Sequence, residues 1–283
     1  MRLSQHTLPQ YFSIANADTS WYQEPTNTFD FVDRGSKTLL VTVGDSWTWG
    51  SDISINNTSN HERLEHVYGQ VLSRAMGADW LNLAISAQGN FWMAGIVAEL
   101  AKIIPDLEYD RICVVCTFTG VLRWFNTRFD QHIDYIKWFQ DHVYTAADFD
   151  QLLTMLNTQC VSSILDSLAP YPHVTLKVAT NFLDPIGLEQ LSAEQRVPRP
   201  WYQVLGCADG HEIYTCVYHQ RISQAIEFID PGLHTAFKHW VIDKIDQSEL
   251  RLQVLKDPAK FRNCHPLAQG HAAWAQYLLT CLN

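Results

Sequence analysis

The sequence predicts an α/β fold in which a central parallel sheet lies between two layers of helices. Two observations carry this prediction. Short apolar runs rich in β-branched residues alternate along the chain with segments whose apolar residues recur at helical spacing. The chain has 283 residues, of which 47% are hydrophobic and 18% are charged, so it can bury a sizeable core. We therefore expect one large domain over residues 1–283, with helical insertions.

The expected elements follow one another in a regular order. Residues 1–36 are polar and aromatic without clear periodicity and are expected to wrap the surface. The expected strands are residues 38–44, 79–84, 110–118 and 173–180. The expected helices of the core are residues 62–76, 91–104 and 267–282. Strands and helices in this alternation predict a parallel sheet with helices on both faces.

Two segments are interpreted as insertions into this core. Residues 121–168 are mostly helical in pattern and rich in aromatic residues. Residues 182–260 contain an irregular part with proline and glycine, followed by an expected helix from about residue 234 to residue 255. The aromatic side chains are expected to pack between insertion and core, and they could also form a lid or wall over a binding site.

Charge and composition argue against several classes of partner. The net charge of -10 argues against nucleic acid or an anionic membrane as the main partner. No stretch is apolar enough, over a sufficient length, to span a bilayer. The seven cysteines form no evident framework, and the N-terminal residues lack the apolar core of a secretory signal. A cytoplasmic protein with reduced thiols is therefore expected.

The pair Cys113 and Cys116 has the spacing of some redox and metal sites. Both lie within an expected buried strand, where positions three apart point to opposite faces of the sheet. We therefore expect two small core residues and no metal site.

A serine follows the first expected strand directly. The apolar run from Leu39 ends in Gly44-Asp45-Ser46, so a buried strand stops at a tight turn that displays a serine. In parallel α/β sheets, active sites lie at the carboxyl ends of the strands. A serine hydroxyl becomes a strong nucleophile only when a base takes its proton. Among twelve histidines, His265 is the best candidate for this base, because Pro266 fixes the backbone just after it. The two side chains are expected within about 2.6–3.2 Å of each other.

The two ends of the chain together resemble the SGNH, or GDSL, superfamily of serine esterases and acyl hydrolases. The GDSxTxG run at residues 44–50 is similar to the first block of that family, and the HPxxxGH run at residues 265–271 is similar to its last block. The resemblance implies a three-layer α/β/α, flavodoxin-like core and hydrolysis of an ester by Ser46 and His265 through an acyl-enzyme intermediate. It implies no metal or organic cofactor. The implied substrate is a small-molecule or glycan ester, such as an O-acetyl group on a carbohydrate.

The resemblance also implies where an oxyanion hole would lie. The backbone amides of Ser46 and of Ala87 or Gly89 are the expected donors from the first and second blocks. The third block of the family normally supplies an asparagine, and this chain has Thr119 at the nearest position. The hydroxyl of Thr119 or the side chain of Asn90 could take that place. The departure matters, because loss of one oxyanion donor can lower the rate by roughly 10²–10³.

The last block normally carries an aspartate two or three residues before the histidine, and here those positions hold Asn263 and Arg262. An asparagine can orient an imidazole but cannot stabilise the imidazolium by charge. Three alternatives stay open: Ser46 and His265 act as a dyad with Asn263, Asp257 folds back to serve as the acid, or the site is weakened.

Three further residues are expected near the substrate. Asp45 and Trp47 flank the serine, and Arg123 follows the third block, where it could bind an anionic group or form a surface salt bridge. His271 is expected to have a structural role in capping or packing. Two alternatives to a hydrolase remain, namely an acyltransferase that uses the same site and a catalytically weakened binding protein that kept the fold.

Overall fold

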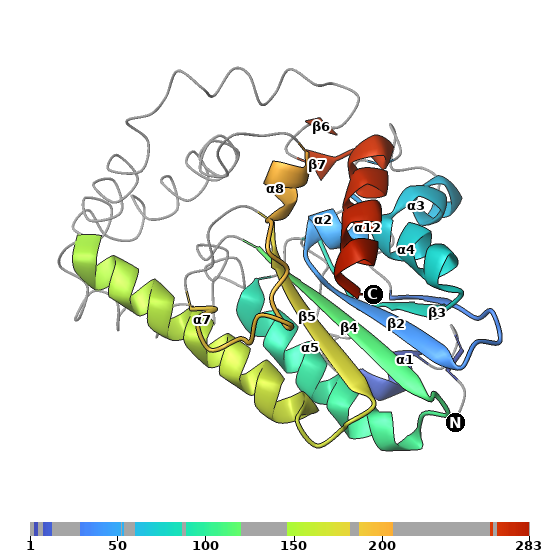
Figure 1. The fold of residues 1–283 in the computed structure, drawn as a ribbon, viewed down its shortest axis with the longest axis horizontal. Coiled ribbons are helices and arrows are strands. Elements are labelled where there is room, and N and C mark those ends of the chain that lie inside the picture. The colour runs from blue at the N-terminus through green and yellow to red at the C-terminus, as the bar shows by residue number, and fades with distance from the viewer. Residues whose placement is uncertain are drawn as a thin grey trace.

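The centre of the molecule is a five-stranded sheet in the order β1-β3-β2-β4-β5. Figure 1 shows β2, β4 and β5 side by side in this sheet. The computed structural model describes residues 3–4, 8–12, 29–51, 53, 60–86, 89–119, 146–181, 187–205, 261–262 and 265–282. Four strands are parallel: β2 (Thr38–Gly44), β3 (Asp79–Asn82), β4 (Arg111–Phe118) and β5 (Val174–Thr180). The predicted α/β class and the four predicted strands are therefore confirmed.

The carboxyl ends of the parallel strands meet at one edge of the sheet. The register pairs Gly44 of β2 with Thr117 of β4, and Phe118 of β4 with Thr180 of β5. Beyond the end of β3, the amide of Ile85 still donates to the carbonyl of Gly44 at 3.2 Å. Residues that follow these strands are consequently brought together although they lie far apart in the sequence.

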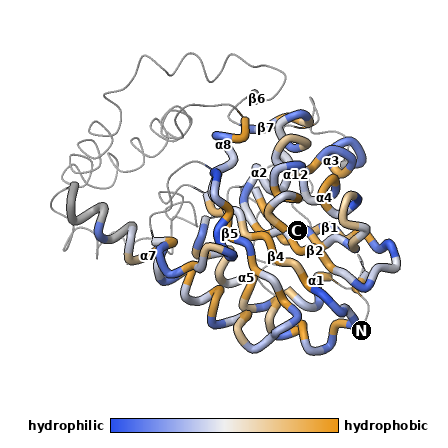
Figure 2. The backbone as a smooth tube through the Cα atoms, in the orientation of Figure 1, coloured by the Kyte–Doolittle hydropathy of each residue, from blue (hydrophilic) through white to orange (hydrophobic). Residues whose placement is uncertain are grey.

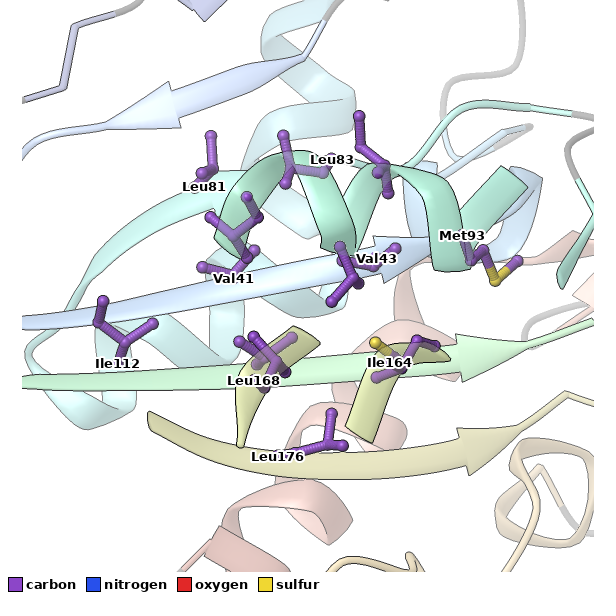
Figure 3. Packing of buried hydrophobic residues seen from close by; sticks show 14 of the residues in the cluster. Val41, Val43, Leu81, Leu83, Met93, Ile112, Ile164, Leu168 and Leu176 are labelled. Carbon is purple, nitrogen blue, oxygen red and sulfur yellow. The ribbon is translucent and has the colours of Figure 1, made fainter. Parts of the chain in front are cut away.

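One face of the sheet is covered by α1 (Leu8–Tyr11), α5 (Asn90–Ile103) and α7 (Ala146–Leu168). Aliphatic side chains fill this interface. The strands are buried on both faces and therefore carry apolar residues at nearly every position. Figure 3 shows strand and helix residues of this cluster packed together, among them Val41, Val43, Leu81, Met93 and Ile164. Along the backbone, Figure 2 shows the hydrophobic colour both on strands of the sheet and on the helices that pack against it.

The other face is covered by α4 (Tyr68–Met76) and α12 (Ala268–Leu282), with α3 (Asn60–His66) and α8 (Trp201–Val204) nearby. Its core is aromatic, and the rings of Trp201 and Trp274 stack with centroids 5.2 Å apart. Cys113 belongs to this cluster, whereas Cys116 belongs to the opposite one. The predicted placement of the two cysteines on opposite faces is confirmed.

Two local features differ from the expectation. The helix predicted over residues 62–76 is divided into α3 and α4, with Val67 in an extended conformation between them. In the segment expected to wrap the surface, β1 (Asp30–Val32) pairs antiparallel with β3 and adds an edge strand to the sheet. Both features depend on partners that are distant in the sequence.

The helix α7 corrects the expected extent of the first insertion. It packs along α5, and it contributes Cys160, Val161 and Ile164 to the core. Since it connects the neighbouring parallel strands β4 and β5, it belongs to the helix layer of the core. The rest of that expected insertion, and the helix expected near residues 234–255, lie outside the described residues.

The second expected insertion is described only over residues 187–205. This segment packs back on the core, because Val178 of β5 bridges to Arg196 and Trp201 of α8 is fully buried. Within the described ranges, no helix combines the length and the apolar character that crossing a membrane requires.

Candidate active site

Ser46 is the first residue of α2 (Ser46–Trp49), a four-residue helix directly beyond the end of β2. Asp45 caps this helix, and its Oδ1 accepts a hydrogen bond from the amide of Trp47 at 2.9 Å. At the other end, the amide of Gly50 donates to the carbonyl of Ser46 at 3.0 Å. The turn therefore holds the serine at the edge of the sheet where the strand ends converge.

Steric constraints explain why two positions of the GDSxTxG run are glycine. Gly50 ends α2 with a φ of 93°, in the left-handed region that side chains rarely adopt. A Cβ atom on Gly44 would collide with the Oγ1 atom of Thr48. The tight connection between β2 and α2 thus requires glycine before the serine as well as after the helix.

His265 meets Ser46 from the other end of the chain. Its Nε2 lies 2.9 Å from Ser46 Oγ, so the predicted contact between the two side chains is present. The histidine lies in β7 (His265–Pro266), which pairs with β6 (Phe261–Arg262) and lies against α2. Ser46 is almost completely covered and His265 is half-buried. In such surroundings a hydrogen bond is electrostatically stronger than in water, and a neutral imidazole can accept the serine proton.

His271 has the structural role that the sequence predicted. Its ring is fully buried, stacks on Tyr68 with centroids 6.2 Å apart, and meets Trp201 edge to face. Nδ1 accepts a hydrogen bond from the amide of Tyr68, the first residue of α4, at 3.2 Å. Burial lowers the pKa of His271 to about 3, so the ring stays neutral at ordinary pH.

Asp45 and Trp47 were expected to contact the substrate, and the structure gives both a different role. Asp45 is fully buried, and its Oδ1 accepts hydrogen bonds from the Trp47 amide and from the side chain of Asn181. Trp47 is buried in the aromatic core, where its ring meets Trp201 edge to face with centroids 5.4 Å apart. The structure thus shows a capping role for Asp45 and a packing role for Trp47, and a contact of either residue with substrate stays a prediction.

Asn90, one of the expected oxyanion donors, is engaged elsewhere. Its Oδ1 accepts from the amide of Thr119 at 2.9 Å. Its Nδ2 donates to the carbonyl of Thr119 at 3.2 Å and to Oδ1 of Asn157 at 2.8 Å. Both hydrogens of the amide are thereby used, so Asn90 clamps the backbone of Thr119 and offers no free donor.

Thr119 lies at the same edge of the sheet as Ser46. It follows the end of β4 and, given the pairing of Gly44 with Thr117, lies two residues beyond that pair, as Ser46 does. Its Oγ1 is buried and has no hydrogen-bond partner among the residues that the structure describes. Gly89 precedes α5 as its N-cap residue. The remaining predicted site residues, Ala87, Arg123, Asp257 and Asn263, lie outside the described residues, and their roles stay predictions.

A buried ion pair supports the far end of the serine turn. Arg63 of α3 binds Oδ1 of Asp30 at 2.7 Å and donates to the carbonyl of Trp49, the last residue of α2, also at 2.7 Å. Its guanidinium lies 4.1 Å from the centre of the Trp49 ring. Asn82 Nδ2 donates to the other carboxylate oxygen of Asp30 at 3.0 Å. Sequence reasoning missed Arg63, because nothing in the pattern of α3 marks an arginine as buried.

Asn181 was missed as well, although the sequence contained a signal for it. The residue follows the expected strand 173–180 directly, at the edge where active-site residues gather. Over the described ranges, no cluster of three or more histidine, cysteine or acidic residues could bind a metal ion.

Comparison with known proteins gives only distant similarities. No protein-family model matches the chain, and no curated protein matches it significantly. A lipase from a goat rumen metagenome is 11% identical, with 86% of this chain and 97% of that chain covered and a TM-score of 0.39. A family two carbohydrate esterase from Cellvibrio japonicus is 14% identical, with 87% of this chain covered and a TM-score of 0.38.

A family 2 carbohydrate esterase from Corynascus thermopiles (Myceliophthora fergusii), with its carbohydrate-binding domain, is 15% identical, with 86% of this chain covered and a TM-score of 0.37. The chain spans 61% of the Cellvibrio protein and 65% of the Corynascus protein. Similarities of this size establish neither a family nor an activity for the chain.

Proposed function

We propose that this protein is a serine ester hydrolase of the SGNH type. The observation that carries the proposal is the 2.9 Å contact between Ser46 Oγ and His265 Nε2. The nucleophile lies at the carboxyl end of a central parallel strand, where ligands bind in open α/β sheets. A serine paired with a base in this way is the minimal unit for acyl transfer.

The proposed reaction has two steps. Ser46 Oγ attacks the ester carbonyl while its proton passes to His265 Nε2, and the tetrahedral intermediate expels the alcohol, which takes that proton. A water molecule then attacks the acyl-enzyme, giving a proton to His265. Collapse of the second intermediate releases the acid and returns the proton to Ser46. No metal or organic cofactor takes part in the proposal.

The developing negative charge needs donors near the carbonyl oxygen. The proposed donors are the amide of Ser46, an amide of Ala87 or Gly89, and the hydroxyl of Thr119. The absence of a hydrogen-bond partner for Thr119 Oγ1 among the described residues supports the last of these. As substrate we propose a small-molecule or glycan ester, because a net charge of -10 disfavours large anionic ligands.

Labelling by a fluorophosphonate tests the proposal directly. The probe should react with the wild-type protein and should not react with Ser46→Ala, because only a serine activated by a base attacks phosphorus rapidly. Ser163→Ala, which removes an exposed serine on α7, is the matched control and should label like the wild type. A wild-type protein that stays unlabelled while folded would contradict the proposal and would favour a non-catalytic binding protein.

The identity of the acid is tested by two substitutions. If Asn263 occupies the position of the family's aspartate, Asn263→Asp should raise the turnover of a short-chain aryl ester, because a carboxylate stabilises the imidazolium that forms on His265. If Asp257 already serves as the acid, Asp257→Asn should lower turnover instead, and Asn263→Asp should bring no gain. Turnover that changes in neither variant would indicate a Ser46–His265 dyad.

A further inference from the structure

The helix that carries Ser46 is too short to maintain its conformation by itself. α2 has four residues, and the first turn of a helix costs more conformational entropy than its hydrogen bonds return. The carboxylate of Asp45 compensates by accepting from the amide of Trp47 at 2.9 Å. The position of Ser46 therefore depends on where that carboxylate is held.

Asn181 holds the same carboxylate oxygen from a neighbouring strand. Its Nδ2 donates to Asp45 Oδ1 at 2.9 Å, and both residues are fully buried. The backbone of Asn181 is fixed on two sides, since its amide donates to the carbonyl of Phe118 at 2.8 Å and its carbonyl accepts from the amide of Tyr202 at 3.1 Å. The amide group is thus presented to Asp45 from a rigid position beyond β5.

The two polar atoms of the Asn181 side chain differ in their hydrogen bonding. Nδ2 is paired, whereas Oδ1 is buried without a hydrogen-bond partner in the described part of the chain. A flipped amide would turn Oδ1 toward the carboxylate, where two acceptors repel each other. A buried acceptor without a partner costs free energy. Asn181 leaves its Oδ1 unpaired while its Nδ2 binds Asp45. We interpret this as a requirement for the hydrogen bond that Nδ2 donates.

We propose that Asn181 is a positioning residue for the reaction, which fixes the Asp45 carboxylate and through it the helix turn that bears Ser46. The proposal rests on the proposed ester hydrolysis at Ser46. Asn181 itself contacts neither the serine hydroxyl nor His265 in the hydrogen bonds described above, so its effect reaches the reaction through Asp45.

The substitution Asn181→Asp tests this positioning role, because it should make kcat depend on pH. It keeps the size of the side chain but places a second carboxylate within hydrogen-bond distance of Asp45. Two carboxylates at this distance share one proton, and the apparent pKa of the pair is raised. At low pH the shared proton restores the hydrogen bond, and at high pH two negative charges repel. The ratio of variant to wild-type kcat should therefore fall roughly tenfold or more between about pH 5.5 and 8.5, with little change in KM.

Several titratable and charged groups on the surrounding elements do not change charge in the pH range over which the kcat ratio is measured. Burial raises the pKa of Tyr68 on α4, raises that of Cys116 on β4 to about 12 and lowers that of His271 on α12 to about 3, so none of the three changes charge in this range. Arg63 on α3 is a further charged group on the surrounding elements, and it is present in both proteins. His265 on β7 is present in both proteins.

Three comparisons complete the test. Asn181→Leu removes the donor and the unpaired oxygen without adding charge, so its kcat should fall roughly tenfold at every pH while its folded fraction is kept. Gln190→Glu, the same change of charge at an exposed position beyond β5, should keep the wild-type profile. Thermal denaturation at each pH gives the folded fraction by which every rate is corrected.

The outcomes separate this proposal from the one on which it rests. A falling ratio for Asn181→Asp together with a flat, lowered ratio for Asn181→Leu supports the positioning role. A flat ratio for Asn181→Asp, wild-type kcat in Asn181→Leu, or losses that merely follow the folded fraction would overturn it while wild-type labelling persists. If Asn181→Asp does not fold, wild-type kcat in Asn181→Leu is still decisive against the role. A wild-type protein that fails to react with the fluorophosphonate defeats the hydrolase proposal, and the positioning role falls with it.

Discussion

Replacing His265 by alanine should lower kcat for a short-chain aryl ester by roughly 10⁴- to 10⁶-fold. Without Nε2 at 2.9 Å, the hydroxyl of Ser46 keeps its proton and is a weak nucleophile. The fold should persist, because the ring is only half-buried and the core on that face is formed by other residues. Steady-state kinetics together with the melting temperature checks both parts of the expectation.

The control for this experiment is His61→Ala, which removes an exposed histidine of α3 and should leave kcat unchanged. The double variant of Ser46→Ala and His265→Ala should be hardly slower than either single variant, because residues that act as one unit do not contribute additively. A double variant that loses the product of the two single effects would show that the serine and the histidine act independently.

Replacing Arg63 by methionine should lower the free energy of unfolding by about 3–5 kcal/mol. The guanidinium is buried and binds Asp30 at 2.7 Å, so its removal leaves a carboxylate charge without its cation in the interior. It also removes the donor from the carbonyl of Trp49 at the end of the serine helix. Urea denaturation followed by tryptophan fluorescence measures the loss.

The contribution of the unpaired Asp30 carboxylate to this loss of stability can be tested separately. Adding Asp30→Asn to Arg63→Met removes that charge and keeps an oxygen for Asn82 Nδ2, so the double variant should be more stable than Arg63→Met alone. Arg74→Met, at an exposed position of α4, should change stability by no more than about 0.5 kcal/mol. A double variant as unstable as Arg63→Met would mean that the isolated carboxylate is not the source of the loss.

The parallel strands could be predicted because each is buried on both faces and therefore appears as an apolar run. The three-residue β1 could not be predicted in this way. It lies in a polar and aromatic segment, and its pairing with β3 rather than its composition makes it a strand. The break at Val67 has a similar cause, since the amide of Tyr68 is satisfied by His271, a residue 203 positions away.

Within the site, the residues that could be predicted are those that their immediate sequence neighbours identify. Ser46 follows an apolar strand in a glycine-bounded turn, and His265 precedes a proline and an apolar helix, so both stand out in the sequence. The polar partners of the turn do not. Arg63, Asn181 and the clamp of Asn90 on Thr119 take their roles from the register of distant strands and helices, which a single sequence does not reveal.

The hydrogen bond of His271 has a consequence for inactivation. The ring belongs to α12, only six residues after His265, and it satisfies the first amide of α4 while Trp274 of the same helix fills the aromatic core. Detaching α12 would therefore uncover the sheet, and it would also remove the contact of α12 with β7, the strand that holds His265 against α2. In the proposed mechanism, a half-folded chain in which β7 and α12 are both still undocked has no base beside Ser46, so it would not attack esters before folding is complete.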